Sequence, residues 1–348
     1  MDVRGLGELV QHHLNLALAP STKRTYTAAE RKYLTFCLDF NFAPLPLCED
    51  VLCHYAASLA KQSLKHQTIK TYLSALRYTQ VMAGFGDPGL SSMPRLEYVL
   101  KGIKVDLAKR SVTQRTRLPI TPPILRKIRS VLSEESAKYE NIMLWAICCT
   151  CFLGFLRSGE ATTPAGLQYD PGAHLSYGDV SLDSNENPSL ARVSIKASKT
   201  DPFRKGVAVY LGRTNNDLCP VTALAAYLAV RGTLPGPFFL LANGCPLTRE
   251  MFVTRVKALL TKAGLNSAHY SGHSFRIGAA TIAAALGVED SLIKTLGRWQ
   301  SSAYLLYVRV PRERLALLSQ TLACSAKYSM LTILSCSSYM NSCPIKAL

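Results

Sequence analysis

The chain has 348 residues, which is enough for two domains of ordinary size, and 48% of them are hydrophobic, so a full core can be buried. No apolar run reaches membrane-spanning length, and the N-terminus lacks the charged start and apolar core of a secretory signal. Lys and Arg number 40 against 23 Asp and Glu, a formal charge of +17, which favours a polyanionic partner because each phosphate contacted releases counterions. A basic protein without such a partner would show the same excess.

The 11 cysteines are scattered at positions that favour burial, and Cys148, Cys149 and Cys151 are examples. Two residues separate Cys148 from Cys151, but neither a second cysteine pair nor a histidine pair accompanies them as in a zinc site. We interpret the cysteines as reduced core thiols and expect an intracellular protein.

The first third of the chain is expected to be a small helical bundle that follows a lead-in over residues 1–20. Ser21 or Thr22 can cap its first helix, which must end before Pro44. Three further helices are predicted, over residues 48–60, from residue 66 onward, and over 94–108. The bundle carries basic residues that could lie along a phosphate backbone, although a solvated helix face explains them nearly as well: Lys61, Lys65, His66, Lys70 and Arg77.

Residues 109–117 have no apolar periodicity and no acid, and they form the best domain boundary in the sequence. The segment contains four cations: Lys109, Arg110, Arg115 and Arg117. A basic linker suits two domains that close around DNA as a clamp, and a short flexible tether would look the same.

The second domain is expected to begin with a helix over residues 122–132 and a strongly apolar, buried helix over 141–156. Arg157 follows this apolar run directly, so it should lie at the edge of the core. Glu160, three residues on, can accept hydrogen bonds from Arg157 or from another cation. An ordinary salt bridge at a helix junction would leave the same pattern.

A β-hairpin is predicted next, because residues 191–196 and 207–211 alternate apolar and polar side chains around a turn. Lys199 would stand at its tip, where an exposed lysine normally serves solubility. Helices are predicted over 220–231 and 248–263. The Ser- and Cys-rich tail, residues 323–348, has little periodicity and is expected to be poorly ordered or partner-dependent.

The stretch from His273 to Tyr307 concentrates polar residues around an Ala-rich segment that should be helical. His273 and Arg276 are three apart, so on a helix they project from one face and could hold a phosphate or carboxylate. A nearby tyrosine could act as a nucleophile once its proton has an acceptor. Taken alone, a His and an Arg at helical spacing more often form a solvated face.

The order of these residues resembles the catalytic series of the tyrosine recombinase, or phage-integrase, family. That series is Arg157 with Glu160, Lys199 in a hairpin, His273-x-x-Arg276, Trp299 and Tyr307. The segments 198–203 and 297–303 look closest to recombinases of DIRS-type and Crypton-type eukaryotic mobile elements, and 72–77 resembles their core-binding domain. The resemblance spans about residues 20–322. It implies a mainly α fold with a small β-sheet (α+β), with a DNA-binding core-binding domain over 21–108 and a catalytic domain over 118–322.

The resemblance also implies a mechanism. Tyr307 would attack a DNA phosphodiester, forming a 3′-phosphotyrosyl bond and releasing a 5′-hydroxyl. Arg157 and Arg276 would bind the non-bridging oxygens, and Lys199 would protonate the leaving 5′-oxygen. His273 would donate to an oxygen or help to deprotonate the tyrosine.

The remaining members of the series have supporting roles in this mechanism. Trp299 would donate its indole N–H to the phosphate, and Glu160 would hold the cations. Cationic side chains do the work of a metal, and the phosphotyrosine keeps the energy of the broken bond. The resemblance therefore implies no cofactor, neither metal nor ATP.

Two positions depart from the family pattern. The family often has His where this chain has Arg298, so Arg298 or Trp299 could take that role, and we prefer Trp299 because family members use Trp there. Tyr304 and Tyr307 could both lie near the site. We prefer Tyr307, which precedes Val308 as the nucleophile does in the family, and expect Tyr304 to pack.

Three hypotheses follow for the function. In the first, the chain is an active recombinase that works on double-stranded DNA as a homotetramer on two duplexes, in the nucleus. In the second, it is a DNA-binding protein derived from a mobile element that no longer cuts DNA. In the third, it is a type IB topoisomerase, which shares the chemistry but acts as a monomer; the small helical bundle fits a recombinase better.

Overall fold

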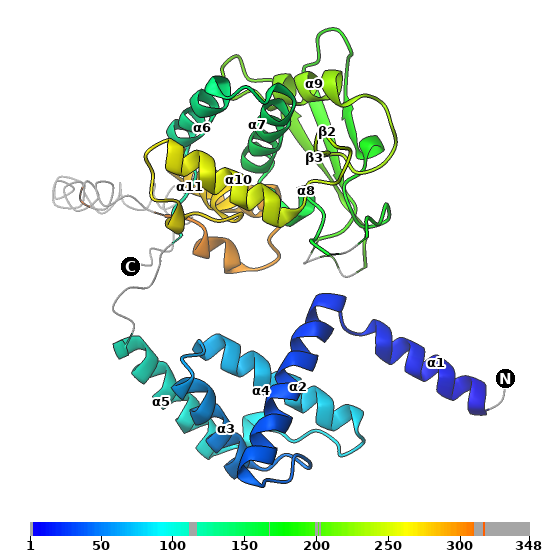
Figure 1. Ribbon diagram of the computed structural model, residues 1–348, viewed down its shortest axis with the longest axis vertical. Helices are drawn as coiled ribbons and strands as arrows, with labels where there is room; N and C mark the ends of the chain where they lie inside the picture. The colour runs from blue at the N-terminus through cyan, green and yellow to red at the C-terminus, as the bar shows by residue number, and fades with distance from the viewer. Residues whose placement is uncertain are drawn as a thin grey trace, which may run out of the picture. The chain divides into compact units, whose positions relative to one another are not determined.

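The computed structural model describes residues 3–110, 117–166, 168–198, 201, 203–309 and 316. Its contacts divide the chain into two compact units, unit 1 (Met1–Gln114) and unit 2 (Arg115–Leu348). Most described residues are helical, and three strands form a small antiparallel sheet (Figure 1). The predicted fold class, mainly α with a small β-sheet, is confirmed.

Unit 1 is helical throughout its described elements. These elements are α1 (Val3–Leu16), α2 (Pro20–Phe40), α3 (Glu49–Lys61), α4 (His66–Met82), the short 3-10 helix η1 (Leu90–Ser92) and α5 (Pro94–Arg110). Proline at the start of α2 has its backbone angle preset for a helix, and Asn41 ends the helix in the left-handed conformation. The predicted lead-in, residues 1–20, therefore consists mostly of α1, a helix that sequence reasoning did not anticipate.

The core of unit 1 is built from aromatic and aliphatic side chains where α2 packs against α4 and α3 against α5. Tyr33, Phe36 and Tyr55 lie within ring contact of one another. Gln80 is buried because its side-chain oxygen accepts a hydrogen bond from the Leu47 backbone at 2.6 Å. Burial of these faces leaves the lysine and arginine side chains of the bundle on its surface.

Unit 2 has seven α-helices among its described residues, with three short 3-10 helices. They are α6 (Pro122–Glu134), α7 (Lys138–Leu153), α8 (Ser158–Ala161), η2 (Tyr177–Asp179), α9 (Pro220–Arg231), α10 (Arg249–Lys262), η3 (Ser267–His269), α11 (Ser274–Ala285), α12 (Asp290–Gly297) and η4 (Ser302–Leu306). The apolar helix α7 lies at the centre and packs against α6, α9 and α11. Its cysteines Cys148, Cys149 and Cys151 are free thiols, and burial raises their pKa values.

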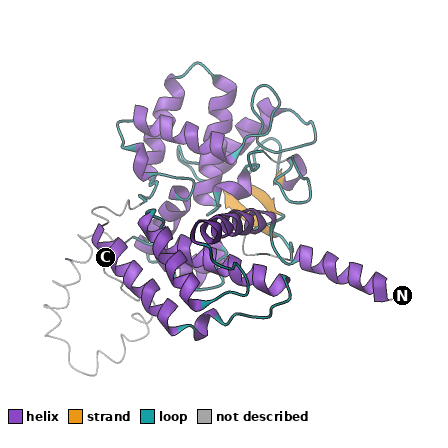
Figure 2. Ribbon diagram, turned by 60° about the horizontal axis from the view of Figure 1, so that its bottom comes forward, coloured by secondary structure: helices purple, strands orange, loops and turns teal. Residues whose placement is uncertain are grey.

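The sheet consists of β1 (Val180–Leu182), β2 (Leu190–Ile195) and β3 (Val207–Gly212), in that order and antiparallel. Ala191, Val193 and Ile195 of β2 alternate toward the core, where α9 packs against β2 and β3. Figure 2 shows the sheet as a small orange patch in a largely helical molecule. The predicted hairpin is present as β2 and β3. The strand β1 was not predicted, because three residues are too few to show a periodicity. Lys199, predicted at the tip of the hairpin, lies outside the described residues.

Two close approaches bring the segments of the predicted site together. A Cβ at Gly278 would lie 1.8 Å from the Ile120 carbonyl oxygen, so only glycine lets α11 pack against this segment. The Ile120 backbone N–H donates to the Ser274 carbonyl at 2.9 Å. A side chain at Gly272 would collide with Ser158, the first residue of α8. The start of α11 is therefore held beside the residues that follow α7.

Some predicted boundaries differ from the observed ones for local reasons. The helix α7 ends at Leu153 because Gly154 and the left-handed Phe155 turn the chain before Arg157. The helix α5 continues through Arg110, so Lys109 and Arg110 belong to its last turn and not to the linker. The tail 323–348 lies outside the described residues. In the ranges that the structure describes, no helix is long and apolar enough to cross a membrane.

Candidate active site

Arg157 lies at the junction between α7 and α8, at the N-terminal cap of α8. Its guanidinium donates to Glu160 Oε1 at 2.7 Å, and its backbone N–H donates to Glu160 Oε2 at 2.9 Å. The predicted contact between the two residues is therefore present. Burial alone would raise the pKa of Glu160, but Arg298 and Arg157 outweigh it and hold that pKa below its ordinary value. The carboxylate stays ionised inside the protein.

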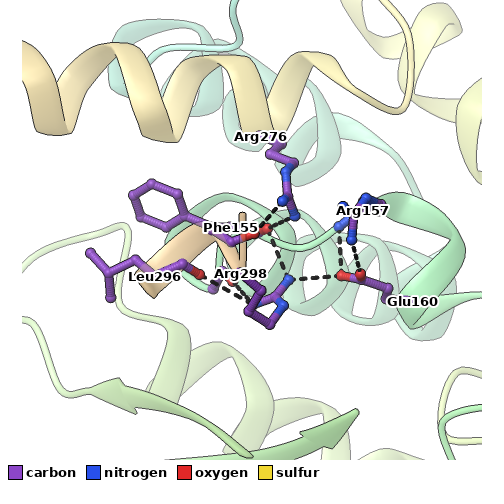
Figure 3. A network of polar contacts seen from close by, with 8 residues as sticks. Phe155, Arg157, Glu160, Arg276, Leu296 and Arg298 are labelled. Atoms are coloured by element: carbon purple, nitrogen blue, oxygen red, sulfur yellow. Dashed lines mark hydrogen bonds and ion pairs between the residues drawn. The ribbon is translucent and has the colours of Figure 1, made fainter. Parts of the chain in front are cut away.

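A second cation, Arg298, binds the same carboxylate from α12. Its Nη2 donates to Glu160 Oε2 at 2.8 Å and to the Phe155 carbonyl at 3.1 Å. Figure 3 shows Glu160 between the two guanidiniums of Arg157 and Arg298. Glu160 therefore links the end of α7 to the end of α12.

Arg276 projects from the first turn of α11 and is fully buried. It donates through Nη1 to the Phe155 carbonyl at 2.8 Å and through Nη2 to the Gly297 carbonyl. Burial, and then the charge of Arg157, lower the pKa of Arg276 to about 9, so the guanidinium remains charged at neutral pH. A buried cation held by carbonyl oxygens is already oriented for an anionic ligand.

Trp299 and Tyr307 lie against Arg276. The Arg276 Cζ is 4.1 Å from the Trp299 ring centroid and 5.8 Å from that of Tyr307, and the two ring centroids are 5.2 Å apart. A Cβ at Gly297 would lie 1.6 Å from Trp299 Cζ3, so glycine at that position makes room for the indole. The three side chains form one cluster, with Tyr307 only partly buried.

His273 precedes α11 and faces the same cluster, its ring centroid 6.4 Å from that of Tyr307. Its Nδ1 is buried and has no hydrogen-bond partner among the described residues. Burial, followed by the charges of Arg117, Arg249, Arg157 and Arg276, lowers the pKa of His273 to about 4. The imidazole is therefore neutral at pH 7, and the negative charge of an anion bound beside these arginines would favour its protonation.

The two tyrosines of this segment have different surroundings. Tyr304 is 3% exposed, and its hydroxyl donates to the Asp290 carboxylate. Tyr307 is partly exposed, and its carbonyl accepts a hydrogen bond from the Thr281 hydroxyl at 3.1 Å, while that hydroxyl accepts one from the Arg309 backbone at 3.1 Å. Thr281 therefore anchors the backbone around Tyr307 to α11. Tyr304 packs, as sequence reasoning expected.

The structure brings together all but one of the predicted catalytic and supporting residues: Arg157, Glu160, His273, Arg276, Trp299 and Tyr307. The exception is Lys199, which lies outside the described residues. Sequence reasoning missed Thr281 and Arg249, because neither belongs to a motif and both reach the site only through folding. Within the described ranges, no three His, Cys, Asp or Glu side chains are grouped to hold a metal ion.

The predicted DNA-binding residues of unit 1 lie on its surface helices and their ends. Within the described part of the chain, Lys61, Lys65 and Lys70 make no ion pair, but Arg77 pairs with Asp87, and Arg110 pairs with Asp106 at 2.7 Å. The helix α2 also carries cations that sequence reasoning missed, at a shallow surface hollow lined by Lys23, Arg24, Thr27, Ala28 and Arg31. Arg115 lies outside the described residues, and Arg117 is an exposed residue of unit 2.

The arrangement suits chemistry on an anion. Guanidiniums fixed by protein acceptors can stabilise developing negative charge, a neutral imidazole can take a proton, and a partly exposed phenol can attack an electrophile. These are the parts needed to transfer a phosphoryl group to a tyrosine.

Comparisons with known proteins find a similar sequence and solved structures of the same fold. The sequence matches no protein-family model. It is 23% identical over 306 residues to the integrase/recombinase XerD homolog of Selenomonas ruminantium, and the match covers 84% of this chain and 82% of that protein.

Solved structures share the fold at lower identity. The integrase of transposon Tn1549 in complex with transposon right-end DNA is 15% identical, with a TM-score of 0.57 over 88% of this chain and 95% of that one. The lambda integrase dimer bound to a COC′ core site is 14% identical, with a TM-score of 0.52 over 87% and 95%. This chain is therefore similar in sequence to an integrase/recombinase homolog and shares its fold with two solved integrases.

Proposed function

We propose that this protein is a site-specific DNA recombinase that cuts and rejoins double-stranded DNA through a 3′-phosphotyrosyl intermediate on Tyr307. The observation that carries the proposal is the cluster of His273, Arg276, Trp299 and Tyr307 beside the Arg157–Glu160 pair. A solvated helix face would not bury a guanidinium completely and surround it with two aromatic rings.

The two arginines would bind the non-bridging oxygens of the scissile phosphate. An arginine has five N–H donors, and Arg276 donates once from each Nη atom to a carbonyl, so these two contacts use only two of its four Nη hydrogens. Arg157 has a side chain 16% exposed, which leaves part of its guanidinium accessible to a ligand. Because both side chains are held before the reaction, they can stabilise the pentacovalent phosphorane without reorganising.

The reaction proceeds by two proton movements and one exchange of bonds. The Tyr307 oxygen bonds to phosphorus as the bond from phosphorus to the 5′-oxygen breaks. The phenol proton passes to neutral His273, and Lys199 gives a proton to the leaving 5′-oxygen. Trp299 donates its indole N–H to a phosphate oxygen. Attack by a 5′-hydroxyl on the phosphotyrosine reverses these steps and frees Tyr307, so each joining event uses the energy stored in the preceding cleavage.

Lys199 would protonate the leaving 5′-oxygen, as the resemblance implies. A substrate with sulfur in place of that bridging oxygen checks this role, because a thiolate leaves without needing a proton. Lys199→Ala should then cleave the sulfur substrate faster than the ordinary one. Equal rates on the two substrates would give Lys199 another role.

Duplex DNA is the partner that the charge and the comparisons support. The solved Tn1549 structure contains transposon DNA and the lambda integrase structure contains a core site. In this proposal unit 1 supplies the core-binding domain over residues 21–108 and unit 2 the catalytic domain over 118–322. The active form is a homotetramer on two duplexes, and the protein acts in the nucleus as the recombinase of a DIRS-type or Crypton-type element.

A nicked suicide duplex tests the proposal, because loss of the short 5′-fragment traps the covalent intermediate. The expected result is a protein–DNA adduct that survives denaturation and maps by peptide mass to Tyr307. DNA binding without an adduct would favour a silent DNA-binding protein. Relaxation of supercoiled DNA by a monomer that never joins two duplexes would favour a type IB topoisomerase.

A further inference from the structure

Arg298 occupies the position next to Trp299 at the end of α12, with its backbone in the left-handed conformation at φ 54°. Its side chain is only 11% exposed. A left-handed conformation is uncommon for a residue other than glycine, so the surroundings must hold it in place. At this site the side-chain contacts of Arg298 can do so.

The guanidinium of Arg298 has an acceptor for each of its four Nη hydrogens. Nη1 donates to the carbonyls of Gly154 and Leu296, both at 3.2 Å. Nη2 donates to the Phe155 carbonyl at 3.1 Å and to Glu160 Oε2 at 2.8 Å. Nε is buried and has no partner among the described residues. These contacts use all four Nη hydrogens of Arg298, whereas the contacts of Arg276 use two of its four, so Arg298 has no Nη hydrogen left for a substrate phosphate.

Arg298 shares its acceptors with both arginines of the proposed phosphate site. The Phe155 carbonyl also accepts from Arg276, and Glu160 also accepts from Arg157 (Figure 3). The adjacent residue Trp299 instead lies over the Arg276 guanidinium and against Tyr307. Trp299 therefore faces the reacting cluster, and Arg298 faces the acceptors that hold Arg157 and Arg276 in place.

We propose that Arg298 is a positioning residue of the recombinase reaction: it orients Arg157 through Glu160 and Arg276 through the Phe155 carbonyl, and it does not bind the phosphate. This inference rests on the proposed function. A carboxylate between two cations cannot approach one of them without leaving the other, so the second cation fixes where Arg157 points. Displacing a catalytic group by about an ångström can cost on the order of a hundredfold in rate.

The test measures cleavage of the suicide duplex by single and double variants. A residue that acts through Glu160 adds little once Glu160 is changed, whereas a residue with its own phosphate contact adds its full loss. Arg298→Lys keeps a cation but cannot reproduce the four hydrogen bonds. We expect it to lose about a hundredfold in cleavage rate, with unchanged DNA affinity.

Two further variants separate positioning from general damage. Glu160→Gln combined with Arg298→Lys should lose no more than the worse single variant, because both act through one contact. Arg255→Lys is the matched control, since Arg255 is also a partly buried arginine that pairs with a carboxylate in unit 2, donating to Glu135 at 2.8 Å. It should cleave the duplex as the wild type does. Should Arg298→Lys fail to fold, Glu160→Gln alone must show the same loss of cleavage rate with unchanged DNA affinity.

The outcomes distinguish failure of the inference about Arg298 from failure of the proposed function. A double-variant loss equal to the product of the two single losses would mean that Arg298 acts independently of Glu160, as a phosphate ligand would, and would overturn the inference. A normal rate for Arg298→Lys or Glu160→Gln would overturn it as well. Absence of an adduct with the wild-type protein would overturn the proposed function itself.

Discussion

The cations of the two units are placed in opposite ways. In unit 1, Lys61, Lys65 and Lys70 lie on the surface, and the pairs that Arg77 and Arg110 form with acids are exposed to solvent. In unit 2, Arg276 is fully buried, and Arg298 and Arg157 are 11% and 16% exposed. Lys and Arg side chains occur in both units, but only the folded structure shows which of them are buried.

This difference separates affinity from chemistry. An exposed lysine is mobile and screened by salt, so it adds to binding on any sequence and contributes little to a rate. A buried guanidinium that is already hydrogen-bonded cannot follow a ligand, but it stabilises charge that develops at a fixed point. Substitutions in unit 2 should therefore change rates, and substitutions in unit 1 should change affinity.

Tyr307→Phe should have the largest effect of all. The variant loses only the hydroxyl, so the ring can keep its contacts with Trp299 and Arg276 while covalent attachment to DNA is abolished. Adduct formation on the suicide duplex and a parallel binding assay measure the two properties. Tyr304→Phe, which loses the hydrogen bond to Asp290, is the control and should still form the adduct. An adduct on Tyr304 in place of Tyr307 would end the assignment.

Arg157→Ala and Arg276→Ala should each remove a charge that matters mainly in the transition state. Loss of one preorganised donor typically costs about 3 kcal/mol, or on the order of a hundredfold in rate. Single-turnover cleavage at saturating protein gives the loss of rate, and a DNA affinity measured at equilibrium gives the loss of ground-state binding. Losses of equal size in rate and in ground-state affinity would instead indicate ordinary phosphate contacts, like those expected in unit 1.

Thr281→Val should slow cleavage less than these variants do. Valine keeps the shape of threonine but loses the hydrogen bonds that connect α11 to the Tyr307 carbonyl and the Arg309 N–H. A net loss of about 1 kcal/mol for a hydrogen bond corresponds to roughly a fivefold change. Thr281→Ser restores the hydroxyl and should recover the rate. If serine and valine behave alike, the hydroxyl does not position the tyrosine.

His273 provides a pH test of burial. Its folded pKa is about 4 against an ordinary value of 6.5, because burial and neighbouring arginines disfavour its charged form. Between these values the unfolded chain binds a proton that the folded one does not, so stability is complete above pH 6.5 and falls as the pH drops toward 4. Denaturation at pH 7 and pH 5 measures the loss.

His273→Asn should lose less stability between these two pH values than the wild type. His54→Asn, which changes an exposed histidine of unit 1, should behave as the wild type does. An unchanged pH dependence in His273→Asn would mean that the imidazole is not held neutral by its surroundings.

Local patterns predicted much of the fold and part of the site. Apolar periodicity placed the helices that became α6, α9 and α10, and the spacing of Arg157 and Glu160 predicted their contact. Sequence favoured Trp299 over Arg298 only by resemblance, because the direction of each side chain depends on the left-handed backbone at Arg298. Thr281 was missed for a related reason: its hydroxyl meets Tyr307 only once η4 packs near α11.

The smallest effect is expected from the surface of unit 1. Neutralising Lys61, Lys65 and Lys70 together, each to Gln, should weaken DNA binding to all sequences alike, because backbone contacts carry no base information. Each lost phosphate contact should also lower the slope of log affinity against log salt by about 0.9. The cleavage rate at saturating protein should stay the same, in contrast to the arginine variants of unit 2.

Lys101→Gln is the matched control for this surface, since Lys101 is an exposed lysine of the same unit that pairs with Glu97 at 3.0 Å. A cation already paired with a carboxylate releases fewer counterions when it meets a phosphate, so its loss should change the salt slope less than loss of an unpaired one. A salt series on the triple variant and the control measures the difference. Equal slopes in the triple variant and the wild type would show that these lysines form only a solvated helix face.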